Sequence, residues 1–143
     1  MQTRQLSANE HLLVFTEPDV ELVAALNEFA QTKNIASGRL QAIGSVSSAT
    51  LAWWNAETKS VDKYTVNGQF EVVSFLGNIA SNTEGPRVHA HMILSGPGGM
   101  LIGGHCVSAT VRASVEVNVT VFDTPVKRVL DDKFNLWVID LSS

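Results

Sequence analysis

One stretch, residues 107–122, restricts the fold of this chain more than any other. Every odd-numbered residue from Val107 to Val121 is valine or alanine, and every even-numbered residue from Ser108 to Thr120 is polar. Side chains alternate between the two faces of a β-strand, so a strict period of two predicts a strand. The chain is therefore expected to contain a long strand with one apolar face and one polar face.

Shorter apolar or alternating runs predict further strands on both sides of this one. The predicted strands are residues 11–15, at the end of the segment 4–15, then 37–54 with a bend at Gly44-Ser45, 61–66, 70–80, 87–95, 100–106, 126–130 and 134–141. The expected turns and loops are residues 55–59, Asn67-Gly68, 81–86, 96–99 and Asp131-Asp132. Residues 70–80 are apolar on both faces, which predicts a central strand covered on both sides or covered by a partner subunit.

A single amphipathic helix is predicted over about residues 17–33. Thr16 can cap its N-terminus, and Asn34 suits its C-terminal end. Within the segment, apolar residues recur at helical spacing at Leu22, Leu26 and Phe29. This spacing indicates a helix that covers a sheet, a role that requires no further function.

The composition is that of a folded domain of moderate size. With 143 residues, 45% hydrophobic and 17% charged, the chain is expected to form one domain, residues 1–143. The net charge of −4 and the pI near 5.5 argue against strong binding to nucleic-acid phosphates. The sequence shows no leader segment and no apolar run of about 18 residues, and Cys106 has no partner for an internal disulfide. These features predict a cytoplasmic protein without a membrane partner.

Residues 87–106 (RVHAHMILSGPGGMLIGGHC) contain most of the side chains that carry chemistry. The segment holds three of the four histidines, five of the ten glycines and the one cysteine. In its first arm His89 and His91 alternate with apolar residues, so both are expected to point away from the apolar face. Two such residues are about 6.6 Å apart along a strand, close enough for both imidazoles to reach one zinc ion. A third candidate ligand, His105, lies on the returning arm.

The length of the loop between the arms decides whether the three histidines meet. A five-residue loop, residues 96–100, places His91 opposite His105, whereas a four-residue loop turns His105 to the other face. A bulge at Gly103-Gly104 would reverse the second outcome. Cys106 would add a fourth ligand only if a bulge brought it to the face of His105. Two hypotheses stay open: a metal site, or histidines that only form hydrogen bonds.

Two polar residues of the long strand are candidates for catalysis beside such a site. Glu116 could act as a general base toward metal-activated water, and Arg112 on the same face could hold a carboxylate or phosphate. The simpler interpretation is that both side chains solvate or pair across the polar face of the strand. The segment GPGG is not a phosphate-binding loop, because no Lys-Ser/Thr pair follows it.

Four segments taken together resemble a known family. ASGRLQAIGSVSSATLAWWNAETK, GQFEVVSFLGNIA, VHAHMILSGPGGMLIGGHC and ASVEV are similar, in this order and spacing, to the PPC (plant and prokaryote conserved) domain, over about residues 4–141. The resemblance implies an α+β fold, an antiparallel, mostly β sheet with one long helix, about residues 17–33, packed on it. It also implies a divalent metal ion, zinc, held by His89, His91 and His105.

The resemblance further implies a class of function. Prokaryotic members of the family look like homotrimers, many carry a DNA-binding label, and the broader fold group resembles acetolactate decarboxylase, which uses a three-histidine zinc. No Arg-Gly-Arg-Pro AT-hook occurs in this chain, so the segment with which plant members grip DNA is absent. The first hypothesis is therefore a stand-alone, non-enzymatic homotrimer, a binding or regulatory module that is DNA-binding by resemblance only. The alternatives are a metal-dependent enzyme or small-molecule binder, and a purely structural trimer.

Overall fold

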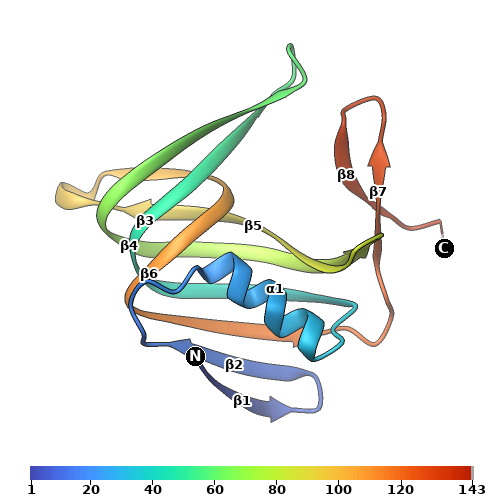
Figure 1. The fold of residues 1–143 in the computed structure, drawn as a ribbon, viewed down its shortest axis with the longest axis horizontal. Helices are drawn as coiled ribbons and strands as arrows, with labels where there is room; N and C mark the ends of the chain where they lie inside the picture. Colours follow the sequence, from blue (N-terminus) through green and yellow to red (C-terminus); the bar gives the residue numbers. More distant parts are fainter. Residues whose placement is uncertain (143) are drawn as a thin grey trace.

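The computed structural model describes residues 1–142, and β-strands make up most of them (Figure 1). In chain order the elements are β1 (Gln2–Ser7), β2 (Glu10–Phe15), α1 (Leu22–Thr32), β3 (Ser37–Asn55), β4 (Ser60–Asn82), β5 (Gly85–Ser95), the 3-10 turn η1 (Pro97–Gly99), β6 (Leu101–Val121), β7 (Lys127–Asp131) and β8 (Leu136–Asp140). The predicted fold class, a mostly β, antiparallel α+β fold with a helix packed on the sheet, is confirmed. No helix of residues 1–142 combines the length and apolar character that crossing a bilayer requires.

Within residues 1–142 the strands form one sheet, antiparallel except where β7 meets β4. The strand order is β1-β2-β6-β3-β4-β7-β8, and β5 pairs with both β4 and β6. β3, β4, β5 and β6 therefore close a ring of hydrogen-bonded strands. In Figure 1 the loop between β5 and β6 lies at the left, the β7–β8 hairpin lies at the right, and α1 lies across the sheet between them.

The alternating stretch that predicted a long strand forms most of β6. Its valines from Val111 to Val119 are at most 1% exposed. The pairing with β3 has three irregularities, and the largest lies where Gly44 and Val46 of β3 pair with Val115 and Val111, so that three residues of β6 lie opposite one. This bulge leaves Ala113 exposed and occurs where a bend in β3 was expected.

The core lies between α1 and the sheet face that carries these valines. Its largest fully buried side chains come from the helix and from β2 to β6: Phe15, Phe75, Leu13, Leu22, Leu26, Leu51, Met92, Leu94, Val46, Val111, Val115 and Val117. Full burial of one such side chain contributes about 1.5–3 kcal/mol. The side chains on the opposite face of β5 and β6 are thereby left to face outward.

The predicted N-terminus of the helix is wrong. The helix begins at Leu22 instead of residue 17, and its N-cap is Glu21 instead of Thr16. The preceding segment extends along β6: the Asp19 N–H donates to the Val111 carbonyl at 3.0 Å, and the Val111 N–H donates to the Val20 carbonyl at 2.9 Å. These backbone hydrogen bonds with a distant strand prevent the segment from continuing the helix toward the N-terminus.

The Glu21 carboxylate holds the start of the helix to the sheet. It accepts hydrogen bonds from the N–H groups of Val23 at 3.0 Å and Ala24 at 2.7 Å, and from the N–H of Ala109 in β6 at 2.9 Å. The first two satisfy unpaired donors of the first helical turn. One side chain therefore caps α1 and fixes its position over β6.

The C-terminal end of the helix agrees with the prediction. Asn34 has a left-handed φ of 54°, and its N–H donates to the Gln31 carbonyl at 3.1 Å. The Ile35 N–H donates to the Ala30 carbonyl at 2.8 Å. The pair of bonds forms a Schellman motif, which ends the helix and turns the chain into β3.

The predicted opening strand, which begins at His11, is present as β2, and β1, which was not predicted, pairs with it so that Arg4 lies opposite Leu12. Two other local predictions are wrong. Asn67-Gly68 does not form a turn but a bulge inside β4, where Gly68 has a φ of 129° and the apolar pattern resumes at once. The expected loop 81–86 shortens because β4 continues to Asn82 and β5 begins at Gly85.

Candidate metal centre

The hairpin of β5 and β6 has the register that brings the histidines together. Ser95 pairs with Leu101, which leaves a five-residue loop, and His91 pairs with His105. The Gly96 N–H donates to the Met100 carbonyl at 2.9 Å and closes the loop. Of the two loop lengths that the sequence left open, the structure therefore has the one that places His105 on the same face as His91.

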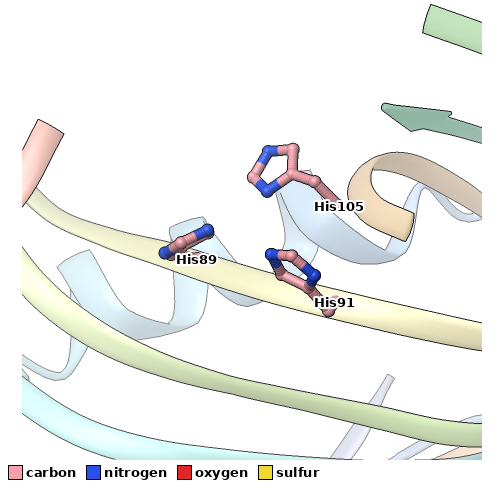
Figure 2. Close-up of side chains that lie close together, drawn as sticks. All are labelled: His89, His91 and His105. Carbon is pink, nitrogen blue, oxygen red and sulfur yellow. The ribbon is translucent and has the colours of Figure 1, made fainter. Parts of the chain in front are cut away.

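Three histidine side chains converge on this outward face. His89 and His91 extend from β5 and His105 extends from β6, and their rings border one common space (Figure 2). One nitrogen from each ring lies within 4.8 Å of those from the other two. The ring centroids are 4.9 Å apart for His89 and His105, 5.5 Å for His89 and His91, and 5.6 Å for His91 and His105.

Burial and positive neighbours keep two of these rings neutral. Burial lowers the pKa of His89 to about 4, and the charges of Arg128, His105 and His91 add to this effect. The pKa of His105 is lowered for the same main reason, with contributions from His91, Lys63 and Arg128. A metal binds the neutral imidazole, so His89 and His105 carry the charge state of a ligand at neutral pH.

The donor set fits a zinc-like divalent ion. Imidazole nitrogen is a preferred ligand of zinc, and three such nitrogens on one face leave a further coordination position for water or another ligand. No carboxylate belongs to the cluster, and no salt bridge within residues 1–142 involves any of the three histidines. The arrangement corresponds to an open metal site.

Cys106 does not belong to this cluster. It lies next to His105 in β6, faces the core and is 4% exposed. Burial raises the pKa of its thiol to about 12, and the charge of Glu21 adds to the increase. The metal ligand would be the thiolate, so a thiol held neutral on the opposite face cannot close the site.

Comparisons with known proteins identify the family. The model of the Plants and Prokaryotes Conserved (PCC) domain matches residues 4–123 of this chain. The chain belongs to this family. The match confirms the family that the segments of the sequence resemble, which is also written PPC. A comparison with curated proteins finds no match at a significant level.

Three solved structures show how closely this PCC domain follows its relatives. A "putative dna binding protein" from Bacteroides thetaiotaomicron has a TM-score of 0.94 at 27% identity, over 99% of this chain and 98% of that chain. A "Putative DNA-binding protein" from Ralstonia eutropha has a TM-score of 0.86 at 26% identity, over 94% and 93%. A metal-containing protein from Archaeoglobus fulgidus has a TM-score of 0.84 at 28% identity, over 92% of both chains.

The two catalytic candidates lie away from the histidines of this PCC domain. Glu116 pairs with Val14 of β2 and Ile43 of β3, eleven residues beyond His105 along β6. Arg112 lines a shallow hollow of about 370 Å³ together with Pro18 and Asp19. Within one chain the structure therefore brings the three histidines together and brings neither candidate to them.

Sequence reasoning missed two residues of the site. Asn78 of β4 pairs with His89, and its side-chain oxygen accepts a hydrogen bond from Arg128 of β7. Nη2 of Arg128 also lies 3.2 Å from Nδ1 of His89. No motif marks either residue, because both reach the cluster through pairing between distant segments.

Proposed function

We propose that this PCC-domain protein is a stand-alone, homotrimeric binding or regulatory module that holds a divalent metal ion, zinc, through His89, His91 and His105. The observation that supports the metal is the convergence of three imidazole nitrogens within 4.8 Å of one another. The structural relative from Archaeoglobus fulgidus, which is called metal-containing, adds support at 28% identity. The lone cysteine, which has no partner for a disulfide, supports a cytoplasmic location.

Metal analysis tests the core of this proposal. Protein purified without a chelator or an affinity tag is expected to carry about one zinc per chain, measured by elemental analysis. His91→Ala should lose it, because two remaining imidazoles hold zinc far more weakly. Cys106→Ser is the matched control and should keep its metal. A metal-free wild-type protein would overturn the proposal.

Exposed apolar side chains around the cluster support assembly. Leu76, the partner of His91 across the strands, is 59% exposed, and Ile93 and Leu101 on β5 and β6 are 44% and 63% exposed. Contiguous apolar surface of this kind marks protein interfaces. The family resemblance to homotrimers suggests that further copies of this chain cover it.

The mass in solution tests the assembly. Light scattering should give close to three times the 15.4 kDa of one chain. Ile93→Glu should lower that mass, because a charge would be buried without a partner. Val129→Glu, on β7 and also 44% exposed, should leave the mass unchanged. A monomeric wild-type protein would exclude the trimer.

DNA binding rests on the family and on the names of two relatives. A net charge of −4 and the absence of an AT-hook predict weak binding at best. Fluorescence anisotropy with a duplex of about 20 base pairs should show an affinity that falls steeply with salt. No binding at low salt would remove DNA from the proposal.

A second candidate function is that of a metal-dependent small-molecule binder or enzyme. The open coordination position that three histidines leave is the observation that favours it. When bound, zinc would act as a Lewis acid toward an oxygen ligand. The protein's own contribution would then come from the polar groups that face the cluster.

A further inference from the structure

The guanidinium group of Arg128 lies beside the histidine cluster, and its hydrogen-bond partners are unusual for a charged group. Nη1 donates to the Trp137 carbonyl at 3.1 Å, and Nη2 donates to the side-chain oxygen of Asn78. Nη2 also lies 3.2 Å from Nδ1 of His89. Nε is shielded from solvent and has no hydrogen-bond partner among residues 1–142. All of its partners are electrically neutral groups.

Within residues 1–142 no carboxylate forms a salt bridge with Arg128. The salt bridges found within residues 1–142 join Met1 to Glu17 and Arg87 to Glu84, and neither involves Arg128. The charged groups that depress the pKa values of His89 and His105 are all positive. A half-buried guanidinium without a counterion is costly, so the site is electropositive in a chain of net charge −4.

The C-terminal hairpin holds Arg128 in this position. Its first strand, β7, is anchored to β4, where Ser81 pairs with Lys127 and the Ser81 N–H donates to the Val126 carbonyl at 2.9 Å. At the far end, Phe134 packs edge-on against Trp54 of β3, with ring centroids 5.9 Å apart. The hairpin begins beyond residue 123, where the match to the PCC family ends. The guanidinium is therefore a positioned group.

The contact with His89 restricts what both residues can do. Arginine has no acceptor, so Nδ1 of His89 must accept the hydrogen bond and the proton of the neutral ring must be on Nε2. In that state neither nitrogen offers a free lone pair to a metal. A metal ion on His89 therefore requires that Arg128 release the ring, and the release leaves a guanidinium donor without a partner next to the cluster.

We propose that Arg128 and the histidine cluster form a binding site for a small carboxylate. The carboxylate accepts hydrogen bonds from the guanidinium that His89 has released, and it lies next to the metal of the proposed function, on which this inference rests. A planar guanidinium matches the two oxygens of a carboxylate. The recessed position of Arg128 and the acidic chain favour a small monoanion over the phosphates of a duplex.

Calorimetry with acetate as the probe tests the site on the zinc-loaded protein. Wild type is expected to bind acetate, and the chelated protein is not, because His89 then keeps its hydrogen bond to Arg128. Arg128→Gln should weaken acetate binding by roughly tenfold or more, the loss expected for a charge-assisted hydrogen bond. The same variant should keep one zinc per chain and bind it more tightly, since the competing donor is gone. Arg4→Gln, on the exposed strand β1, is the matched control and should bind acetate like wild type.

Each contrary outcome has a separate meaning. If wild type holds no zinc, both the proposed function and this inference fail. If zinc is bound but acetate binds equally to wild type and Arg128→Gln, only the carboxylate site is wrong. If the variant loses affinity for a 20-base-pair duplex while its acetate binding is unchanged, Arg128 serves DNA instead. Arg128→Lys, which keeps the charge without the planar fork, replaces Arg128→Gln if the latter does not fold, with the same expected loss.

Discussion

His105 and Cys106 are neighbours in β6 and face opposite sides of the sheet. Burial lowers the pKa of the first and raises that of the second, to about 12. The cause is the same, since a low-dielectric surrounding disfavours the charged form of either group. The chemical result differs, because the neutral imidazole is a metal ligand whereas the neutral thiol is not. In β6, one face therefore presents His105 as a candidate metal ligand, and the other face buries Cys106 as an unreactive thiol.

The largest expected effect lies on the core face. Phe75→Ala should lower the free energy of unfolding by about 3–5 kcal/mol, because it leaves a cavity at a fully buried position. Chemical denaturation of the chelated protein measures the change. Val129→Ala, at a position of β7 that is 44% exposed and lies outside the surface proposed for assembly, is the control. If Val129→Ala costs as much as Phe75→Ala, the buried and exposed positions do not differ as described.

Substituting His105 and Cys106 of β6 one at a time tests the comparison of the two faces directly. His105→Ala should weaken zinc binding by more than about 100-fold, since loss of even an outer partner of a ligand costs 10–100-fold. Cys106→Ala should keep zinc and lose about 1 kcal/mol of stability. Competition with a zinc indicator and chemical denaturation give the two values. Loss of zinc from the cysteine variant would contradict the separation of the faces.

The attachment of α1 to the core face by Glu21 is expected to contribute less to the free energy of unfolding than the burial of Phe75. Glu21→Ala removes the cap of α1 and the acceptor of the Ala109 N–H, and should cost about 1–2 kcal/mol. Thermal or chemical denaturation measures it. Glu28→Ala, at an exposed position of the same helix, should stay within about 0.5 kcal/mol of wild type. Equal losses would show that Glu21 acts only through helix propensity.

The pH dependence of stability should contain one contribution from His89 on the outward face and another from Cys106 on the core face. The folded pKa of His89 is about 4 and its ordinary value is 6.5, so the unfolded metal-free chain binds the proton first and stability decreases as pH falls from 6.5 to 4. Cys106 has a folded pKa of about 12 against an ordinary 9.0, so the unfolded thiol ionises first and stability decreases as pH rises above 9. Denaturation across pH should show the acid decrease weakened in His89→Asn and the alkaline decrease weakened in Cys106→Ser. Unchanged profiles would disprove the assignments.

The features that local pattern controls were predictable from the sequence. Alternation placed His89 and His91 on the outward face, and the period of two from Val107 onward predicted most of β6. Loop length alone did not choose between two registers, because glycines at 103 and 104 permitted a bulge that the fold does not use. The meeting of the histidines was thus a conditional prediction, which the pairing of His91 with His105 satisfies.

The features that depend on distant partners were not predictable. Glu21 caps the helix only because Val111 of β6 holds the preceding backbone extended and the Ala109 N–H donates to the Glu21 carboxylate, and no local motif predicts either contact. Arg128 reaches His89 across thirty-nine positions of sequence, by way of the pairing of β7 with β4. In both cases a polar side chain takes its role from sheet topology and not from its neighbours in the chain.

The ring formed by β3, β4, β5 and β6 determines at which step the backbone beneath the histidines loses its conformational entropy. β5 pairs with β4 along its length, its far half pairs with β6, and the Val88 N–H donates to Asn27 of α1 at 2.8 Å. The backbone under His89 and His91 is thus immobilised when the chain folds, before an ion arrives. An ion would meet a backbone that is already ordered, unlike the ion that folds a zinc finger. The strands should accordingly keep slow amide hydrogen exchange after chelation, and a metal ion bound by the histidines could leave and return without unfolding the domain.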